Sequence, residues 1–146
     1  MLEKFIIYTD GGARRNPGPA GAGVVVQNSA GAVVKEAHKY LGLMTNNEAE
    51  YQAVILGLET IKKLVGKERV KNLLIEIRLD SELVARQLAG KYQIKETTLI
   101  PLFIKIWNLK IELGNISFVE IPREKNTEAD RVLNEELDGA NIQSKL

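Results

Sequence analysis

The sequence predicts an α/β fold built on one five-stranded mixed sheet with helices on its faces. Residues 1–43 contain three apolar stretches separated by Gly, Pro and Asn, a pattern typical of an antiparallel meander. From residue 47 onward the spacing of apolar residues alternates between the helical and the strand period. The resulting order is βββαβααβα, and a meander followed by βαβ crossovers implies one sheet covered by helices.

Three strands are expected in the first third of the chain, at residues 5–9, 23–27 and 33–43. The residues between the first two strands are rich in Gly and Pro, including Gly11-Gly12 and the run Asn16-Pro17-Gly18-Pro19. Such residues are typical of turns, so we expect a long turn over residues 11–21.

The remaining elements alternate between helix and strand. Apolar residues at helical spacing predict a helix over 47–65, and the alternation of Ile75, Ile77 and Leu79 with polar residues predicts a strand. Gly139 is expected to end the last helix. Trp107 is expected in the core, because its helix is rich in Ile and Leu. The other elements are expected at these positions: strands at 73–79 and 116–121, and helices at 82–89, 99–113 and 127–137.

Composition excludes several classes of protein. The chain has 146 residues, no Cys and one His, so disulfides, thiolate metal sites and poly-His zinc sites are excluded. Lys and Arg number 20 against 19 Asp and Glu, so any nucleic-acid binding must use a local patch. We expect a single domain over 1–146, with a core at about 3–138 and a short tail at 139–146. No membrane span or secretory signal is visible, and a cytoplasmic monomer is expected.

Two aspartates follow predicted strands that are expected to be parallel neighbours. Asp10 comes where the first strand ends, and Asp80 comes where the fourth ends. Their side chains should therefore meet at the carboxyl edge of the sheet, where open α/β sheets bind ligands. Each aspartate alone is equally well explained as a turn or helix-capping residue.

The first predicted helix carries two glutamates with different environments. Thr45 and Glu48 fit a capping box, which gives Glu48 a structural role. Glu50 lies on the apolar stripe with Ala53 and Val54 and so faces the sheet. A carboxylate on a buried face needs a cation or strong donors, and this stripe has no Lys or Arg.

Asp130 lies in the first turn of the last predicted helix, where a capping role with Thr127 is an equal alternative. Together Asp10, Glu50, Asp80 and Asp130 could form a four-carboxylate cluster. Mutual repulsion makes such a cluster unstable unless divalent cations bind. Ligation by oxygen alone favours Mg²⁺ or Mn²⁺ over Zn²⁺.

At this point the sequence resembles ribonuclease H of type 1, in a compact form. The resemblance spans residues 8–130 and rests on four ordered motifs, each with its acid in place, together with a Gly-Pro segment. These are Tyr8-Thr9-Asp10-Gly11-Gly12, Asn16-Pro17-Gly18-Pro19, Thr45-Asn46-Asn47-Glu48-Ala49-Glu50-Tyr51, Leu79-Asp80-Ser81 and residues 122–130. The element order is also that of the ribonuclease H-like fold.

The resemblance implies an endonuclease that hydrolyses the RNA strand of RNA–DNA hybrids and leaves 5′-phosphate and 3′-hydroxyl ends. It implies that the four acids bind two Mg²⁺ ions, with Mn²⁺ as an alternative, roughly 4 Å apart. One ion would activate the attacking water and the other would stabilise the leaving oxygen. Residues expected to contact the hybrid are Asn16, Thr45, Asn46 and Glu82. For Asn16, a role as a turn residue before Pro17 is the alternative.

Three departures from the family pattern matter. The loop before Asp130 lacks the His of many members, so Arg123 or Glu124 is a candidate substitute, and His38 is expected at the surface. The link at residues 90–95 replaces a longer basic insertion; its lysines either contact DNA phosphates or are solvated. The chain begins at the first strand, so no separate hybrid-binding domain is expected and substrate binding should be sensitive to salt.

Competing interpretations concern substrate and catalysis. A nuclease of the same fold that acts on double-stranded RNA or RNA–DNA junctions would carry the same acids. A binding module without catalysis should have lost one of them, and all four are present. A doubly wound small-molecule binder would leave Glu50 unexplained.

Overall fold

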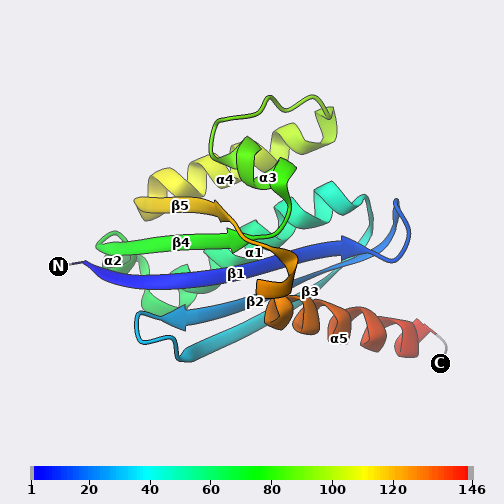
Figure 1. Cartoon of the computed structure of the whole chain (residues 1–146), viewed down its shortest axis with the longest axis horizontal. Helices are drawn as coiled ribbons and strands as arrows, with labels where there is room; N and C mark the ends of the chain where they lie inside the picture. Colours follow the sequence, from blue (N-terminus) through cyan, green and yellow to red (C-terminus); the bar gives the residue numbers. More distant parts are fainter. Residues whose placement is uncertain (1, 145–146) are drawn as a thin grey trace.

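The computed structural model describes residues 2–144, with side chains described for residues 2–139. Its centre is one five-stranded sheet in the order β3-β2-β1-β4-β5, in which β1 pairs antiparallel with β2 and parallel with β4 (Figure 1). This confirms the predicted mixed sheet. The strands are β1 (Glu3–Ala13), β2 (Gly18–Asn28), β3 (Val33–Met44), β4 (Leu73–Leu79) and β5 (Asn115–Glu120).

The helices follow the predicted order, with one additional short helix after the first. The two 3₁₀ turns are η1 (Thr97–Leu99) and η2 (Arg123–Lys125). The helices are α1 (Asn46–Val65), α2 (Lys67–Val70), α3 (Glu82–Leu88), α4 (Ile100–Leu113) and α5 (Thr127–Ser144). Gly66 separates α1 from α2 with a positive φ of 86°, a conformation that favours glycine.

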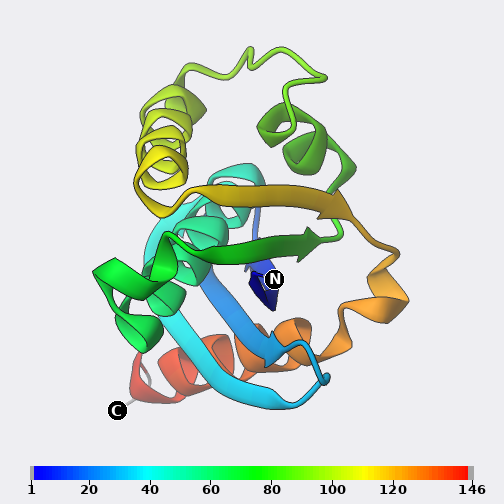
Figure 2. The same ribbon diagram turned by 90° about the vertical axis from the view of Figure 1, so that its left-hand side faces the viewer.

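Helices α1 and α5 cover opposite faces of the sheet (Figures 1 and 2). Two consecutive glycines of β1 show this directly, because successive residues of a strand face opposite sides. A Cβ on Gly11 would meet the backbone of Ala49 in α1, whereas a Cβ on Gly12 would face Leu133 in α5. Helix α4 packs against α1, so the main core lies between the sheet and these two helices.

The expected long turn over residues 11–21 is wrong. Strand β1 continues to Ala13 and β2 begins at Gly18, and the two remain paired up to Ala13 and Ala20. The glycines serve close packing instead: a Cβ on Gly23 would lie 2.4 Å from the Ala129 carbonyl oxygen of α5. Sequence alone does not distinguish a glycine needed for a turn from one needed for a close approach.

Two further expectations are wrong. Helix α5 continues through Gly139 to Ser144, because glycine weakens a helix without ending it. Trp107 is 51% exposed and stacks on Phe103, since α4 turns Ile106, Leu109 and Leu113 toward the core instead. Of the tail expected at 139–146, residues 145–146 lie outside the described residues.

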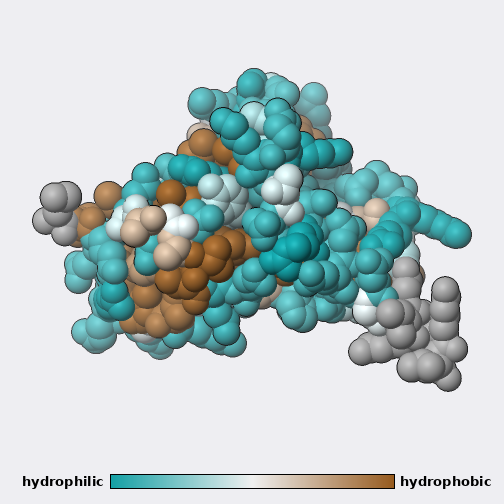
Figure 3. All heavy atoms as spheres, turned by 60° about the horizontal axis from the view of Figure 1, so that its bottom comes forward, coloured by the Kyte–Doolittle hydropathy of each residue, from teal (hydrophilic) through white to brown (hydrophobic). Residues whose placement is uncertain are grey.

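The surface is mixed in polarity. Figure 3 shows an apolar area toward the N-terminal end of the molecule. Over all five strands, the exposed large apolar residues are Val33, Val34, Tyr40, Leu43 and Leu74. Among residues 2–144, no helix combines the length and apolar character that crossing a membrane requires.

Candidate active site

The two strand aspartates meet at one edge of the sheet. The parallel register of β1 and β4 ends at the pair Tyr8 and Arg78, and Asp10 and Asp80 each follow two residues later. The predicted placement of Asp80 directly after its strand is confirmed. Asp10 differs, because it lies within β1, where pairing with β2 continues after pairing with β4 has stopped.

Glu50 reaches the same edge from α1. The predicted capping box is confirmed: the Thr45 hydroxyl accepts from the Glu48 backbone N–H at 3.2 Å, and the Glu48 side chain accepts from the Thr45 N–H. This cap starts the helix so that Glu50 faces the sheet, where it is 8% exposed. The helix lies so close to β1 that a Cβ on Gly11 would be 2.1 Å from the Ala49 carbonyl oxygen.

The three carboxylates form a compact group. One oxygen from each of Asp10, Glu50 and Asp80 lies within 4.8 Å of the others. They line a cavity of about 370 Å³ together with Asp130 and Arg123. Asp130 is exposed and lies outside the compact group, yet its charge acts on Asp10.

Burial and mutual repulsion disfavour ionisation of the two buried acids. Burial, followed by the charges of Asp80 and Asp130, raises the pKa of Asp10 to about 8. Burial and the charges of Asp10 and Asp80 raise the pKa of Glu50 well above its usual range, although a Gly11 backbone hydrogen bond opposes this. A divalent cation would reverse this balance, because it favours the ionised form of every carboxylate that it contacts.

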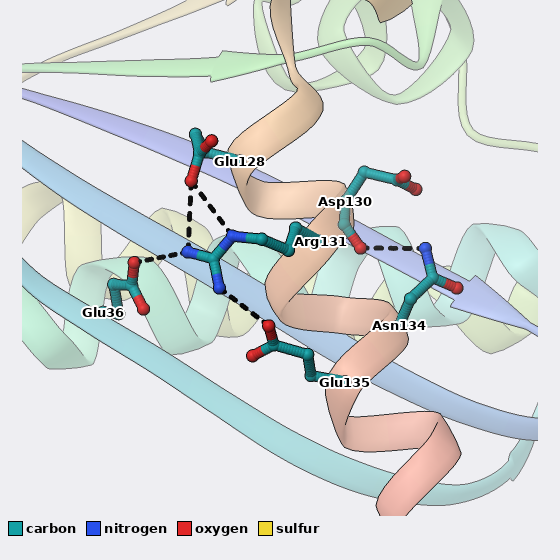
Figure 4. Close-up of polar contacts among 6 residues, drawn as sticks. All are labelled: Glu36, Glu128, Asp130, Arg131, Asn134 and Glu135. Atoms are coloured by element: carbon teal, nitrogen blue, oxygen red, sulfur yellow. Dashed lines mark hydrogen bonds and ion pairs between the residues drawn. The ribbon is translucent and has the colours of Figure 1, made fainter.

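Helix α5 carries Asp130, and its Arg131 forms an ion pair with the sheet (Figure 4). Arg131 forms an ion pair with Glu36 of β3 at 2.6 Å and also contacts Glu128 and Glu135 of its own helix. Asn134 donates to the Asp130 backbone carbonyl at 2.9 Å. The ion pair with Glu36 joins α5 to β3, whereas the other contacts lie within α5 itself.

The residues expected to contact a hybrid divide into two groups. Asn46 lines the acid cavity, and its Oδ1 accepts from the Ala13 N–H at 2.8 Å. Asn16 lies beside it and accepts from the Asn46 N–H at 3.0 Å, while Thr45 caps α1. Glu82 does not line this cavity; it lies against Arg86 and the Tyr92 hydroxyl.

The loop before α5 places the positively charged side chain of Arg123 near the acids. Arg123 lines the cavity, and its charge opposes the rise in the pKa values of Asp10 and Glu50, whereas Glu124 does not line the cavity. His38 is on the surface as expected, with its side chain 62% exposed and its Nδ1 2.6 Å from Glu136.

Sequence reasoning missed the role of Asn126. This residue is 1% exposed, and its side-chain Nδ2 donates to the Thr9 carbonyl and to Asp80 Oδ2, both at 2.9 Å. It lies between η2 and α5, in a segment without hydrophobic periodicity, so no pattern marked it as buried. Its place within residues 122–130, which carry the family resemblance, was the only signal.

A mixed sheet with clustered carboxylates at its carboxyl edge defines a class of α/β protein suited to binding divalent cations. Residues 8–135 match the family model described as "Reverse transcriptase-like". The chain is 37% identical over 138 residues to the "Bifunctional protein Rv2228c" of Mycobacterium tuberculosis, covering 94% of this chain and 36% of that protein. It is 36% identical over 133 residues to "Ribonuclease HI" of Halobacterium salinarum, covering 91% of this chain and 64% of that protein.

The solved structures include LC11-RNase H1, which was isolated from compost by a metagenomic approach. That structure is 48% identical, has a TM-score of 0.88 and covers 94% of this chain and 97% of its own. LC11-RNase H1 has also been solved in complex with an RNA/DNA hybrid, with a TM-score of 0.89 to this chain. The chain belongs to the ribonuclease H type 1 family, in its compact form.

Proposed function

We propose that this chain is a metal-dependent endonuclease that hydrolyses the RNA strand of RNA–DNA hybrids. The observation that carries the proposal is the group of Asp10, Glu50 and Asp80, which come from three elements to within 4.8 Å of one another. Family membership supports it, because the related LC11-RNase H1 binds an RNA/DNA hybrid.

The residues present fit a divalent cation. Glu50 Oε2 is buried and has no hydrogen-bond partner among the described residues, so this oxygen is available to coordinate a cation. The donors are all carboxylate oxygens, which suit Mg²⁺ and Mn²⁺. Asp10, Glu50, Asp80 and Asp130 would hold two such ions. When bound, the ions would activate water for in-line attack on phosphorus and stabilise the leaving 3′-oxygen, giving 5′-phosphate ends.

Other side chains near the acids would bind and orient the substrate. Arg123 carries a positive charge at the cavity and would attract a phosphate of the strand being cut. Asn46 and Asn16 lie at the rim, where amide groups would donate to phosphates and to 2′-hydroxyls. The 2′-hydroxyl distinguishes RNA from DNA, so these contacts would direct cleavage to the RNA strand.

A second cavity lies next to the first and would receive the uncut strand. It has a volume of about 480 Å³ and is lined by Lys91, Lys95 and Tyr92, among others. Asn47 of the acid cavity donates to Glu96 of the second cavity at 2.7 Å, so the two are neighbours. The two lysines would contact phosphates of the strand that is paired with the RNA.

The test is cleavage of one labelled RNA strand presented single, paired with RNA, or paired with DNA, in Mg²⁺, Mn²⁺ or EDTA. We expect cutting of the DNA-paired strand alone, in either metal but not in EDTA, with 5′-phosphate ends. Cutting of the RNA-paired strand as well would show a wider substrate class. Binding of the hybrid without cutting in any metal would contradict the proposal and indicate a binding module.

A further inference from the structure

Asn126 connects the separate elements that carry the acids. Its side-chain NH₂ group donates to the Thr9 carbonyl of β1, next to Asp10, and to Asp80 Oδ2 after β4. Its backbone carbonyl accepts from the Asp130 N–H of α5 at 3.2 Å, and its own N–H donates to the Arg123 carbonyl at 2.9 Å. One buried residue thus contacts the surroundings of three acids.

The orientation of this amide follows from its partners. A backbone carbonyl and a carboxylate only accept hydrogen bonds, so the donating NH₂ group must face both of them. This leaves Asn126 Oδ1 buried and without a partner among the described residues. An unpaired buried acceptor lowers stability, and such a cost in a native fold calls for an explanation.

The two hydrogen bonds of the Asn126 amide lie where the sheet no longer joins β1 to β4. Pairing between β1 and β4 ends at Tyr8 and Arg78, so no sheet register holds Asp80 next to Asp10. The two bonds from Asn126 span this gap. One of them occupies Asp80 Oδ2, so the other Asp80 oxygen is free of this contact, and Asp80 lines the acid cavity.

We propose that Asn126 is a positioning residue that orients Asp80 for divalent-cation binding. This inference rests on the proposed function, because it takes the acid group to be a metal site. Groups that orient a metal ligand by hydrogen bonding generally change metal affinity or activity about 10–100-fold when they are removed. Asn126 would act in this way through Asp80, without contacting the ion.

The experiment is calorimetric titration of the folded chain with Mn²⁺ in the absence of nucleic acid. For Asn126→Ala we expect Mn²⁺ binding about tenfold or more weaker than in the wild type. Asn28→Ala is the matched control, because Asn28 also makes two hydrogen bonds, to the Ala30 and Ala32 N–H groups in the β2–β3 turn. We expect this control to bind Mn²⁺ as the wild type does.

A double-mutant cycle separates positioning from a general structural effect. If Asn126 acts through Asp80, Asn126→Ala will weaken Mn²⁺ binding far less in an Asp80→Asn background than in the wild type. An equal weakening in both backgrounds would overturn the proposal, as would wild-type affinity in Asn126→Ala. Asn126→Ser keeps one donating hydrogen and replaces Asn126→Ala if that variant does not fold; we expect weaker binding there too.

The same titration distinguishes the metal site itself from the positioning role of Asn126. A wild-type chain that binds no Mn²⁺ would contradict the proposed function, and the positioning role with it. A wild-type chain that binds Mn²⁺, with an Asn126 variant of equal affinity, would contradict the positioning role alone.

Discussion

At the scale of single residues, the site is built from acids that the fold alone does not favour in their charged form. Asp10 and Glu50 are both buried, and their surroundings supply few donors. The raised pKa values of these groups mean that their ionisation is unfavourable in the metal-free chain. A bound divalent cation would favour their ionised forms, so stability, pH and metal binding should be linked.

We expect the stability of the metal-free chain to depend on pH through Asp10. The pKa of Asp10 rises on folding from 3.8 to about 8, so between these values the folded chain holds a proton that the unfolded chain has lost. The free energy of unfolding should therefore decrease as pH rises through this window, by up to about 1.4 kcal/mol per pH unit for one proton. Urea unfolding in EDTA at pH 5 and pH 8 measures this effect.

Asp10→Asn is the control for this measurement, because it removes the titrating group. The stability of the wild type relative to Asp10→Asn should fall between pH 5 and pH 8, and Mg²⁺ should raise wild-type stability most at pH 8. A relative stability that stays constant or rises with pH would show that Asp10 is already ionised in the metal-free chain.

For single residues, the sequence predicted the environment correctly where a local pattern shows which way a side chain points. The capping box separated Glu48 from Glu50, and the helical stripe placed Glu50 against the sheet. The sequence did not predict burial that depends on contacts between distant segments. Asn126 is buried by tertiary contacts with β1 and Asp80 that are distant in sequence, so no local pattern reveals them.

At the scale of elements, close approach between helices and β strands assembles the site. Gly11 allows α1 to lie on β1, and Gly23 allows α5 to lie on β2. These approaches bring Glu50 and Asp130 within reach of Asp10. The sequence alone did not predict the role of these glycines, because glycine is typical both of turns and of close packing contacts.

We predict opposite effects for two Gly→Ala substitutions. Gly11→Ala would place a Cβ 2.1 Å from the Ala49 carbonyl oxygen and should lower stability by about 1–3 kcal/mol or more. Gly139→Ala, where a Cβ meets nothing within 4 Å in α5, should raise stability by up to about 1 kcal/mol. Urea unfolding of both variants is the measurement. Wild-type stability in Gly11→Ala would contradict the close approach of α1.

The buried side of helix α4 could not be predicted from the sequence. Its apolar residues occur on several sides, so composition alone predicts burial for all of them. The structure buries Ile106, Leu109 and Leu113 and exposes Trp107. Which side faces the core is set by packing against α1, and that contact joins segments far apart in the chain.

At the scale of the whole molecule, the mixed sheet and its parallel β1–β4 neighbours could be predicted because meander and βαβ patterns permit few topologies. That topology is what brings β1, β4 and α1 to one edge. The proposed contacts with substrate do not follow from topology, since they would depend on loops such as residues 89–96 and on the cavity that Lys91 and Lys95 line.

The role of the acid group in catalysis is tested most directly by comparing two neighbouring glutamates of α1 in hydrolysis of a DNA-paired RNA strand with Mg²⁺. Glu50→Gln keeps the shape but removes a charge from the acid group, and should lower the rate by more than about a hundredfold. Glu48→Gln preserves the capping pattern, since Gln also serves in a capping box, and should leave the rate within about threefold of the wild type. Equal loss in both variants, or full activity in Glu50→Gln, would contradict a site built on Asp10, Glu50 and Asp80.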